Sequence, residues 1–326
     1  VVIFNYAAQV ILNGVRKGRG ENDKEVEDTF AYLPCGGGTN LYDGLKTCID
    51  IAKKSPRQYV KRVILITDGM PTAGNTDPAD IAALAKAAYD EGILIYVYGI
   101  GEDYDLPLCD AIAKNGGGWL RHIVNPKDIE KYTGVGTKRD KATVVDILNL
   151  NVTLDRDAVV ENAYVVIPSI KPLGGCTGQC VWPIGSLTAG EPIILAMEIV
   201  SQSQQPGRKK VAEFTVGGSS VSLEVEFTHE TPTFTENAIP RIYLQVAHIV
   251  AKIDEKIKTE QDYSKELEIL RKIYENPETQ QAVRQDLYLL ALIQKHLRTI
   301  VDYKTRIDQG TRVDPRQLRD ELMNIS

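Results

Sequence analysis

Two short segments of this chain contain side chains whose oxygen atoms are of the types that bind cations or act as nucleophiles. Thr39 ends the run Gly36-Gly37-Gly38-Thr39 and precedes an expected helix, while Asp68 follows an apolar, strand-like run. Hydroxyl and carboxylate oxygens are ligands for Mg²⁺, and an aspartate at a strand end can also accept a phosphoryl group. Each residue alone has a structural alternative, Thr39 as a helix N-cap and Asp68 as an Asx-turn residue.

The elements around these two residues alternate between strand and helix. Over residues 1–139 we expect strands at 1–4, 8–12, 62–66, 93–98 and 119–124, and helices at 40–53, 77–91, 106–114 and from Pro126 to Tyr132. This order is typical of βαβ units, so the expected fold is an α/β doubly wound parallel sheet, Rossmann-like. Ligands of such sheets bind beside the carboxyl ends of the strands, where Thr39 and Asp68 are expected.

Two motifs carry a family resemblance. The motif G-G-T-N-L-x-x-G-L at 37–45 and the motif T-D-G-x-P-T at 67–72 resemble two segments of the metal-ion-dependent adhesion site (MIDAS) of the von Willebrand factor A (vWA) family. The resemblance covers about residues 1–139 and includes the strand and turn at 4–10. It implies that Thr39 ligates a metal directly and that Asp68 acts through water. It further implies a partner-binding rim formed by Asn40, Asp43 and Met70, although Asp43 also fits a solvated acid in a first helical turn.

The sequence departs from the family in one respect. The family's first metal segment, D-x-S-x-S on the central strand, occurs nowhere in this chain. We therefore expect an N-terminally truncated vWA domain from a longer protein, because the chain opens within a strand. The implied cofactor is Mg²⁺ (or Mn²⁺ or Ca²⁺) at an incomplete site, since two donors cannot fill a near-octahedral shell. A missing central strand also predicts a split sheet with unpaired edges.

The resemblance implies a binding protein rather than an enzyme. We expect divalent-metal-dependent protein–protein interaction within a larger assembly, with an acidic side chain of the partner meeting the metal. One alternative is a structural scaffold subunit that needs no metal. Another is a Mg²⁺-dependent phosphohydrolase that uses Asp68, although the chain contains no P-loop, H-E-x-x-H or G-x-S-x-G motif. The four histidines, His122, His229, His248 and His296, are scattered and indicate structural positions.

The rest of the chain predicts two further domains. Strand-like runs separated by turns indicate an antiparallel β-sandwich domain at 140–232, and apolar residues at helical spacing indicate a helical bundle at 233–326. We expect one long helix to begin at Pro277 and a linker near 228–235. The order of domains resembles that of bacterial and archaeal multidomain vWA proteins.

Five cysteines leave a redox question open. Cys176 and Cys180 lie in a glycine-rich loop, 174–180, and are either a local disulfide or two free thiols. Zinc is disfavoured because no second Cys/His pair at zinc spacing accompanies them. Cys35, Cys48 and Cys109 have apolar neighbours and are expected to be small core side chains.

Composition excludes several classes of protein. The chain has 326 residues, of which 43% are hydrophobic and 25% are charged, as in ordinary globular domains. The net charge of −6 and the lack of any lysine or arginine cluster longer than two or three residues argue against nucleic acid as the main partner. No apolar run reaches the length of about 20 residues that a membrane helix needs. The sequence names neither a partner nor an oligomeric state, and among compartments we favour the cytoplasm.

Overall fold

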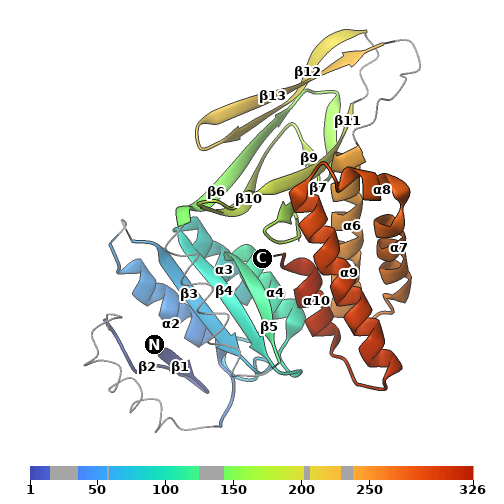
Figure 1. Ribbon diagram of the computed structural model, residues 1–326. Coiled ribbons are helices and arrows are strands. Elements are labelled where there is room, and N and C mark those ends of the chain that lie inside the picture. The colour runs from blue at the N-terminus through green and yellow to red at the C-terminus, as the bar shows by residue number, and fades with distance from the viewer. Residues whose placement is uncertain (15–35, 57–58, 125–142, 202–205, 229–237, 326) are drawn as a thin grey trace. The chain divides into compact units, whose positions relative to one another are not determined.

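A computed structural model describes residues 1–14, 36–56, 59–124, 143–201, 206–228 and 238–325 (Figure 1). The chain forms two compact units, Val1–Ile129 and Glu130–Ser326, and each is described by itself. Cys35, the helix expected from Pro126 and most of the expected linker lie outside the described residues. The bounds of the three domains expected from the sequence stay predictions.

The first unit is built on a parallel sheet with the order β3-β4-β5. Its strands are β3 (Lys61–Thr67), β4 (Ile93–Ile100) and β5 (Gly117–Ile123), and the helices between and before them are α2 (Leu41–Lys53), α3 (Pro78–Asp90) and α4 (Leu106–Asn115). Side-chain oxygens of Asn40, Asp77 and Asp105 cap the three helices, and proline occupies the first turn of α3 and α4. The vWA-like α/β fold with a parallel sheet is therefore confirmed.

The described part of this unit contains a second, separate sheet. Strands β1 (Val2–Phe4) and β2 (Ala8–Val10) pair only with each other, in antiparallel register. Helix α2 nevertheless contacts β1, β2 and β3, so both sheets lie against the same helix. On β3, Ile64 and Ile66 are 51% and 42% exposed although strands of a parallel sheet are normally covered on both faces. A sheet split in this way is what the missing central strand predicts.

Gly118 lies at a β-bulge where β5 comes closest to β4. Ile95 is opposite Gly117 and Val97 is opposite Leu120, so β5 has one extra residue here. A Cβ atom on Gly118 would lie 2.0 Å from the carbonyl oxygen of Ile95. That oxygen belongs to the backbone of a buried strand and cannot move aside cheaply.

We expect Gly118→Ala to lower the free energy of unfolding of the first unit by about 1–3 kcal/mol, because one strand must shift. Urea unfolding followed by the fluorescence of Trp119, in a Trp182→Phe background, measures this unit alone. The matched control is Gly69→Ala, whose added Cβ would have its nearest neighbour at 3.8 Å. Equal losses for the two variants would contradict the steric argument.

The second unit contains two antiparallel sheets that share one hydrophobic core. One sheet has the order β10-β6-β12-β13, and the other has the order β11-β7-β8 with β9 also paired to β7. The core includes Leu150 and Val152 from the first sheet and Val160 from the second, packed around Trp182. The strands are β6 (Thr143–Leu154), β7 (Ala158–Ile167), β8 (Lys171–Pro172), β9 (Cys176–Thr177), β10 (Gln179–Thr188), β11 (Ile194–Ser201), β12 (Gly207–Val216) and β13 (Ser219–Phe227).

Three strands of this unit, β8, β9 and β10, are absent from the sequence-based expectation. The region 174–180 is predicted as a loop, but it contains β9 and the start of β10, which are joined by a tight turn and belong to different sheets. Gln179 is opposite Thr153 and Trp182 is opposite Leu150, so β10 pairs along most of β6. Glycine and proline in β10 mask its pattern, and pairing with β6 rather than local propensity holds it in the sheet.

The helices of the second unit follow the strands in the sequence. They are α6 (Ala238–Lys258), α7 (Ser264–Glu275), α8 (Pro277–Ala282), α9 (Leu287–Asp308) and α10 (Pro315–Met323). Helix α6 contacts β7 and β11 with the apolar face that the sequence predicts. The expectation of one long helix from Pro277 is wrong. The helix that begins at Pro277 ends at Ala282, and a new helix begins at Leu287. Asp286 caps this new helix, α9, by accepting hydrogen bonds from the Tyr288 and Leu289 amides at 2.9 and 3.0 Å.

Candidate functional site

Three loops of the first unit are tied together at the N-terminus of α2. They are the turn 5–7 between β1 and β2, the glycine-rich loop 36–40, and the loop 68–74 after β3. The Asn40 amide donates to the Asn5 carbonyl at 2.6 Å, and the Asn40 side-chain amide donates to the Tyr6 carbonyl at 2.9 Å. The Thr72 amide donates to the Thr39 carbonyl at 3.0 Å. The loops expected to carry the site therefore lie next to each other.

Thr39 is fixed by its backbone, and its side chain faces the loop after β3. The Thr39 amide donates to Thr72 Oγ1 at 2.9 Å. A Cβ atom on Gly69, the residue after Asp68, would lie 3.8 Å from Thr39 Oγ1. The structural alternative for Thr39, capping the helix, belongs to Asn40, whose Oδ1 accepts a hydrogen bond from the Asp43 amide at 3.1 Å. The Thr39 hydroxyl is not needed for that cap.

Asp68 follows the last residue of β3 and is exposed to solvent. Before it, Thr67 is buried and its hydroxyl donates to the Gly69 carbonyl at 3.3 Å, which shapes the turn. Asp68 thus lies at the carboxyl end of β3, in the loop whose next residue, Gly69, faces Thr39. One hydroxyl and one carboxylate are brought to neighbouring loops.

The three residues of the expected rim have different surroundings. Met70 is exposed on the loop after β3, as is Tyr6 on the turn before β2. Asp43 Oδ2 accepts a hydrogen bond from the Ala8 amide at 2.7 Å, so this carboxylate holds β2 against α2. Asn40 is enclosed, because a Cβ on Gly74 would come within 2.3 Å of its side chain. Asp43 and Asn40 therefore have structural tasks, and a role for either at a partner surface stays a prediction.

Sequence reasoning did not single out three residues that build this site. Thr72, Tyr6 and Gly74 join the loops through hydrogen bonds and close packing. Thr72 could have been found, because it ends the motif at 67–72 and its threonine hydroxyl accepts from the facing loop. Tyr6 acts through its backbone carbonyl, and Gly74 acts because it has no side chain. Neither role leaves a signal in a single sequence.

The donor set of this site matches a hard cation only in part. Thr39 and Asp68 supply oxygen atoms of the type that Mg²⁺ or Mn²⁺ prefers. In the part of the chain that the structure describes, no group of three or more His, Cys, Asp or Glu side chains could hold a metal. A metal ion bound at Thr39 and Asp68 would therefore need further ligands, from water or from another segment, to complete its coordination shell.

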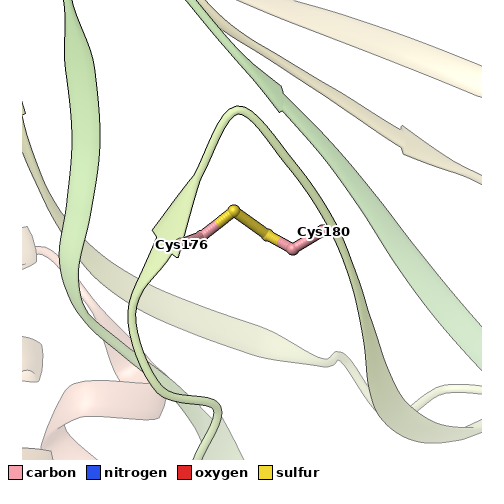
Figure 2. Close-up of a disulfide and its surroundings, with 2 residues drawn as sticks. All are labelled: Cys176 and Cys180. Atoms are coloured by element: carbon pink, nitrogen blue, oxygen red, sulfur yellow. A yellow bond between two sulfur atoms is a disulfide. The ribbon is translucent and has the colours of Figure 1, made fainter.

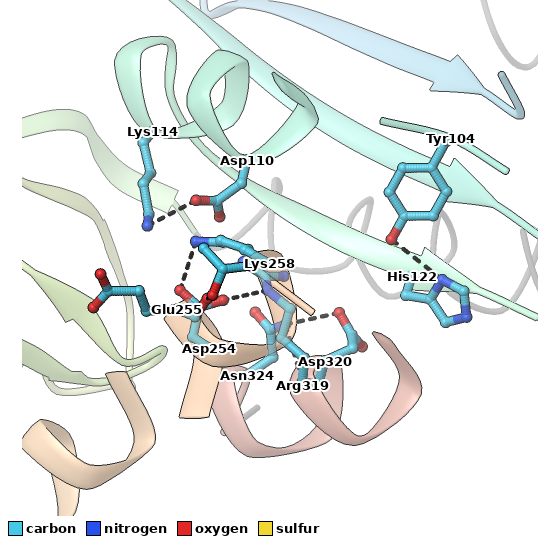
Figure 3. Close-up of polar contacts among 11 residues, drawn as sticks. Tyr104, Asp110, Lys114, His122, Asp254, Glu255, Lys258, Arg319, Asp320 and Asn324 are labelled. Carbon is cyan, nitrogen blue, oxygen red and sulfur yellow. Dashed lines mark hydrogen bonds and ion pairs between the residues drawn. The ribbon is translucent and has the colours of Figure 1, made fainter. Parts of the chain in front are cut away.

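Other side chains that the sequence singled out have structural surroundings. Cys176 and Cys180 form a disulfide across the turn between β9 and β10 (Figure 2). Cys109 is buried and Cys48 is half-buried, and neither forms a disulfide. Three of the histidines each face a tyrosine: His122 and Tyr104 (Figure 3), His248 and Tyr164, and His296 and Tyr274. His229 lies outside the described residues.

Comparison with known proteins identifies the first unit. Residues 4–136 match the family model described as von Willebrand factor type A domain. This part of the chain is a vWA domain, as its parallel sheet and its two loop motifs indicate.

Curated relatives share this domain. Inter-alpha-trypsin inhibitor heavy chain H4 of Sus scrofa is 29% identical over 114 residues, which cover 33% of this chain and 12% of the relative. The uncharacterized protein sll0103 of Synechocystis sp. is 27% identical over 128 residues, which cover 39% of this chain and 29% of the relative. The chain thus spans less than a third of either relative.

A solved structure has a similar fold over most of the chain. The von Willebrand factor type A protein from Catenulispora acidiphila superposes with a TM-score of 0.70 at 18% identity, over 90% of this chain and 72% of the other. A vWA-like α/β sheet accompanied by antiparallel sheets and helices therefore occurs in both proteins. Among the described helices, none has the length and apolar character needed to cross a membrane.

Proposed function

We propose that the vWA domain binds a partner protein through a divalent cation held at Thr39 and Asp68. The observation that carries the proposal is the placement of Thr39 Oγ1 against Gly69, the neighbour of Asp68. Hydrogen bonds between Thr39 and Thr72 fix the two loops in this arrangement. This proximity of the two loops supports a site that uses residue types of the MIDAS motif.

The chemistry of the two donors favours binding over catalysis. A neutral hydroxyl and a single carboxylate neutralise only part of the charge of a divalent cation. A cation bound there would therefore keep a net positive charge and attract an acidic side chain of a partner. We propose that the remaining donors come from a D-x-S-x-S segment outside the sequence given. Among the described strands, β1 and β3 each pair along one edge alone, which is consistent with this proposal. Tyr6 and Met70, both exposed beside the site, would contribute apolar contacts to the same partner.

The test compares two aspartates in a protein that includes the D-x-S-x-S segment. We expect Asp68→Ala to weaken Mn²⁺ or Mg²⁺ binding, measured by isothermal titration calorimetry, by about tenfold or more, because Asp68 orients the metal's water ligands. Asp90→Ala is the control, since Asp90 is exposed at the end of α3 and pairs only with Lys86 in the described residues. Binding of an acidic peptide should fall in the same variant and in chelator.

The alternatives predict different results in the same experiment. Peptide or partner binding that is equal in Mg²⁺ and chelator, and unchanged by Asp68→Ala, would favour a scaffold subunit. Turnover of a phosphorylated substrate that Asp68→Asn abolishes would favour a phosphohydrolase.

A further inference from the structure

Strand β13 forms one end of the four-stranded sheet in the second unit. Within the described residues it pairs with β12 alone, so its outer edge offers free backbone amides and carbonyls. Its side chains alternate between two faces. Val221, Leu223, Val225 and Phe227 point inward, because Val221 lies opposite Phe214 of the core and Leu223 opposite buried Ala212. Figure 1 shows β13 as the outermost strand of this sheet.

The inward row of β13 is left largely uncovered. Val221, Leu223 and Val225 are 69%, 38% and 37% exposed. Beside them is an open apolar groove of about 410 Å³ lined by Leu150, Leu195, Met197, Ile199, Phe214 and Leu223. Leu195, Met197 and Ile199 belong to β11, which is the end strand of the facing sheet. The facing sheet therefore covers the inward side chains of β13 only in part.

Apart from Glu224 and Glu226, the sequence of β13 lacks the devices that normally keep an edge strand from pairing. Its nine residues contain no lysine and no proline, and its apolar side chains alternate over the full length. The register shift in the β12–β13 ladder lies at Lys210–Ala212 on β12, away from the free edge. The strand is long, regular and available for pairing.

The strand is complementary to itself. In an antiparallel pair of two β13 strands with full overlap, Ser219 lies opposite Phe227, and Leu223 lies opposite Leu223 of the second copy. Val221 then faces Val225, which joins the two inward rows into one apolar surface. Glu224 faces Ser222 and Glu226 faces Ser220, so no carboxylate opposes another.

Charge disfavours one of the two neighbouring registers. Sliding one strand by two residues in one direction places Glu224 opposite Glu224, and like charges directly opposite each other are destabilising. In full overlap Glu224 also keeps its own partner, because Arg208 Nε donates to its Oε2 at 2.6 Å within the same copy. We propose that β13 is a dimer interface, through which the sheet continues into the sheet of a second copy of this chain.

Sedimentation velocity of the 326-residue chain at increasing concentration tests the proposal. We expect a monomer–dimer equilibrium that Leu223→Lys weakens by at least about tenfold, because two ammonium groups would meet on the two-fold axis. A monomer at every concentration would overturn the proposal, and is the result expected if the groove serves another protein or a further segment of this chain.

A matched pair of variants tests the register. Ser220→Lys and Ser220→Glu lose the same hydrogen bond between Ser220 and Thr215 in their own copy, and both lie on the exposed outer face. Because Ser220 faces Glu226 of the second copy, the lysine variant should lower the dimer Kd and the glutamate variant should raise it, each several-fold. A dimer that responds equally to both would contradict this interface. Far-UV circular dichroism checks that each variant is folded.

Discussion

Asp254→Asn is expected to lower the free energy of unfolding of the second unit by about 3–5 kcal/mol. Asp254 on α6 and Arg319 on α10 are 3% and 4% exposed and form an ion pair (Figure 3). Lys258 also donates to Asp254 Oδ2 at 2.6 Å. Without the carboxylate charge, the two cations repel each other beside a buried neutral amide. Urea unfolding followed by Trp182 fluorescence, in a Trp119→Phe background, measures the loss.

Two further variants separate charge from packing. The double variant Asp254→Leu with Arg319→Met should recover much of the lost stability, because an apolar pair has no charge to desolvate and Lys258 is near enough to solvent to reach it. The exposed pair between Arg241 and Glu278 is the control. Arg241→Met should cost less than about 1 kcal/mol. An Asp254→Asn loss as small as that of the control would show that the buried pair contributes little.

The regular elements of this fold could be predicted from periodic apolar residues. The alternating burial of β3, the continuous burial of β4 and the apolar stripe of α6 leave a period of two, an apolar run and a period of 3.6 in the sequence. The break between α8 and α9 could not be predicted in this way. It depends on the Asp286 side chain capping the next helix, whereas the apolar pattern on both sides continues across it.

The candidate site could be predicted as two loops but not as a network. Thr39 and Asp68 are signalled by their motifs and by strand ends. The assignment of the cap to Asn40 rather than Thr39 depends on the φ and ψ angles of adjacent residues, which similar side chains do not reveal. Asp43 is bound to the Ala8 amide, a contact between residues 35 positions apart, and a single sequence carries no trace of it.

His296 gives the second unit a pH dependence that can be assigned to one residue. Its side chain is fully buried between α7 and α10. Nε2 lies 2.9 Å from the Leu322 carbonyl, which can only accept, so Nε2 carries the proton and Nδ1 accepts from the Tyr274 hydroxyl. Burial lowers the pKa of His296 to about 4, and the positive charge of Lys295 acts in the same direction. The buried ring is therefore neutral near pH 7.

The stability of the second unit should fall as the pH falls from 7 to 5. The histidine of the unfolded chain takes up a proton near its ordinary pKa of about 6.5, whereas the folded ring does not until about pH 4. The unfolded state binds more protons in this window, so the stabilisation is complete above pH 6.5 and is lost progressively below it. The expected loss between pH 7 and pH 5 is about 2 kcal/mol.

Urea unfolding at a series of pH values, again followed by Trp182, measures this slope. His296→Gln keeps a side chain that can donate to Leu322 and accept from Tyr274 but cannot titrate, so it should remove the slope while lowering stability at every pH. His248→Gln is the comparison: burial lowers the pKa of His248 too, but its ring is half-exposed, so this variant should remove a smaller part of the slope than His296→Gln. If His296→Gln retained the full slope between pH 7 and pH 5, the dependence would belong to other groups and His296 would titrate alike in both states.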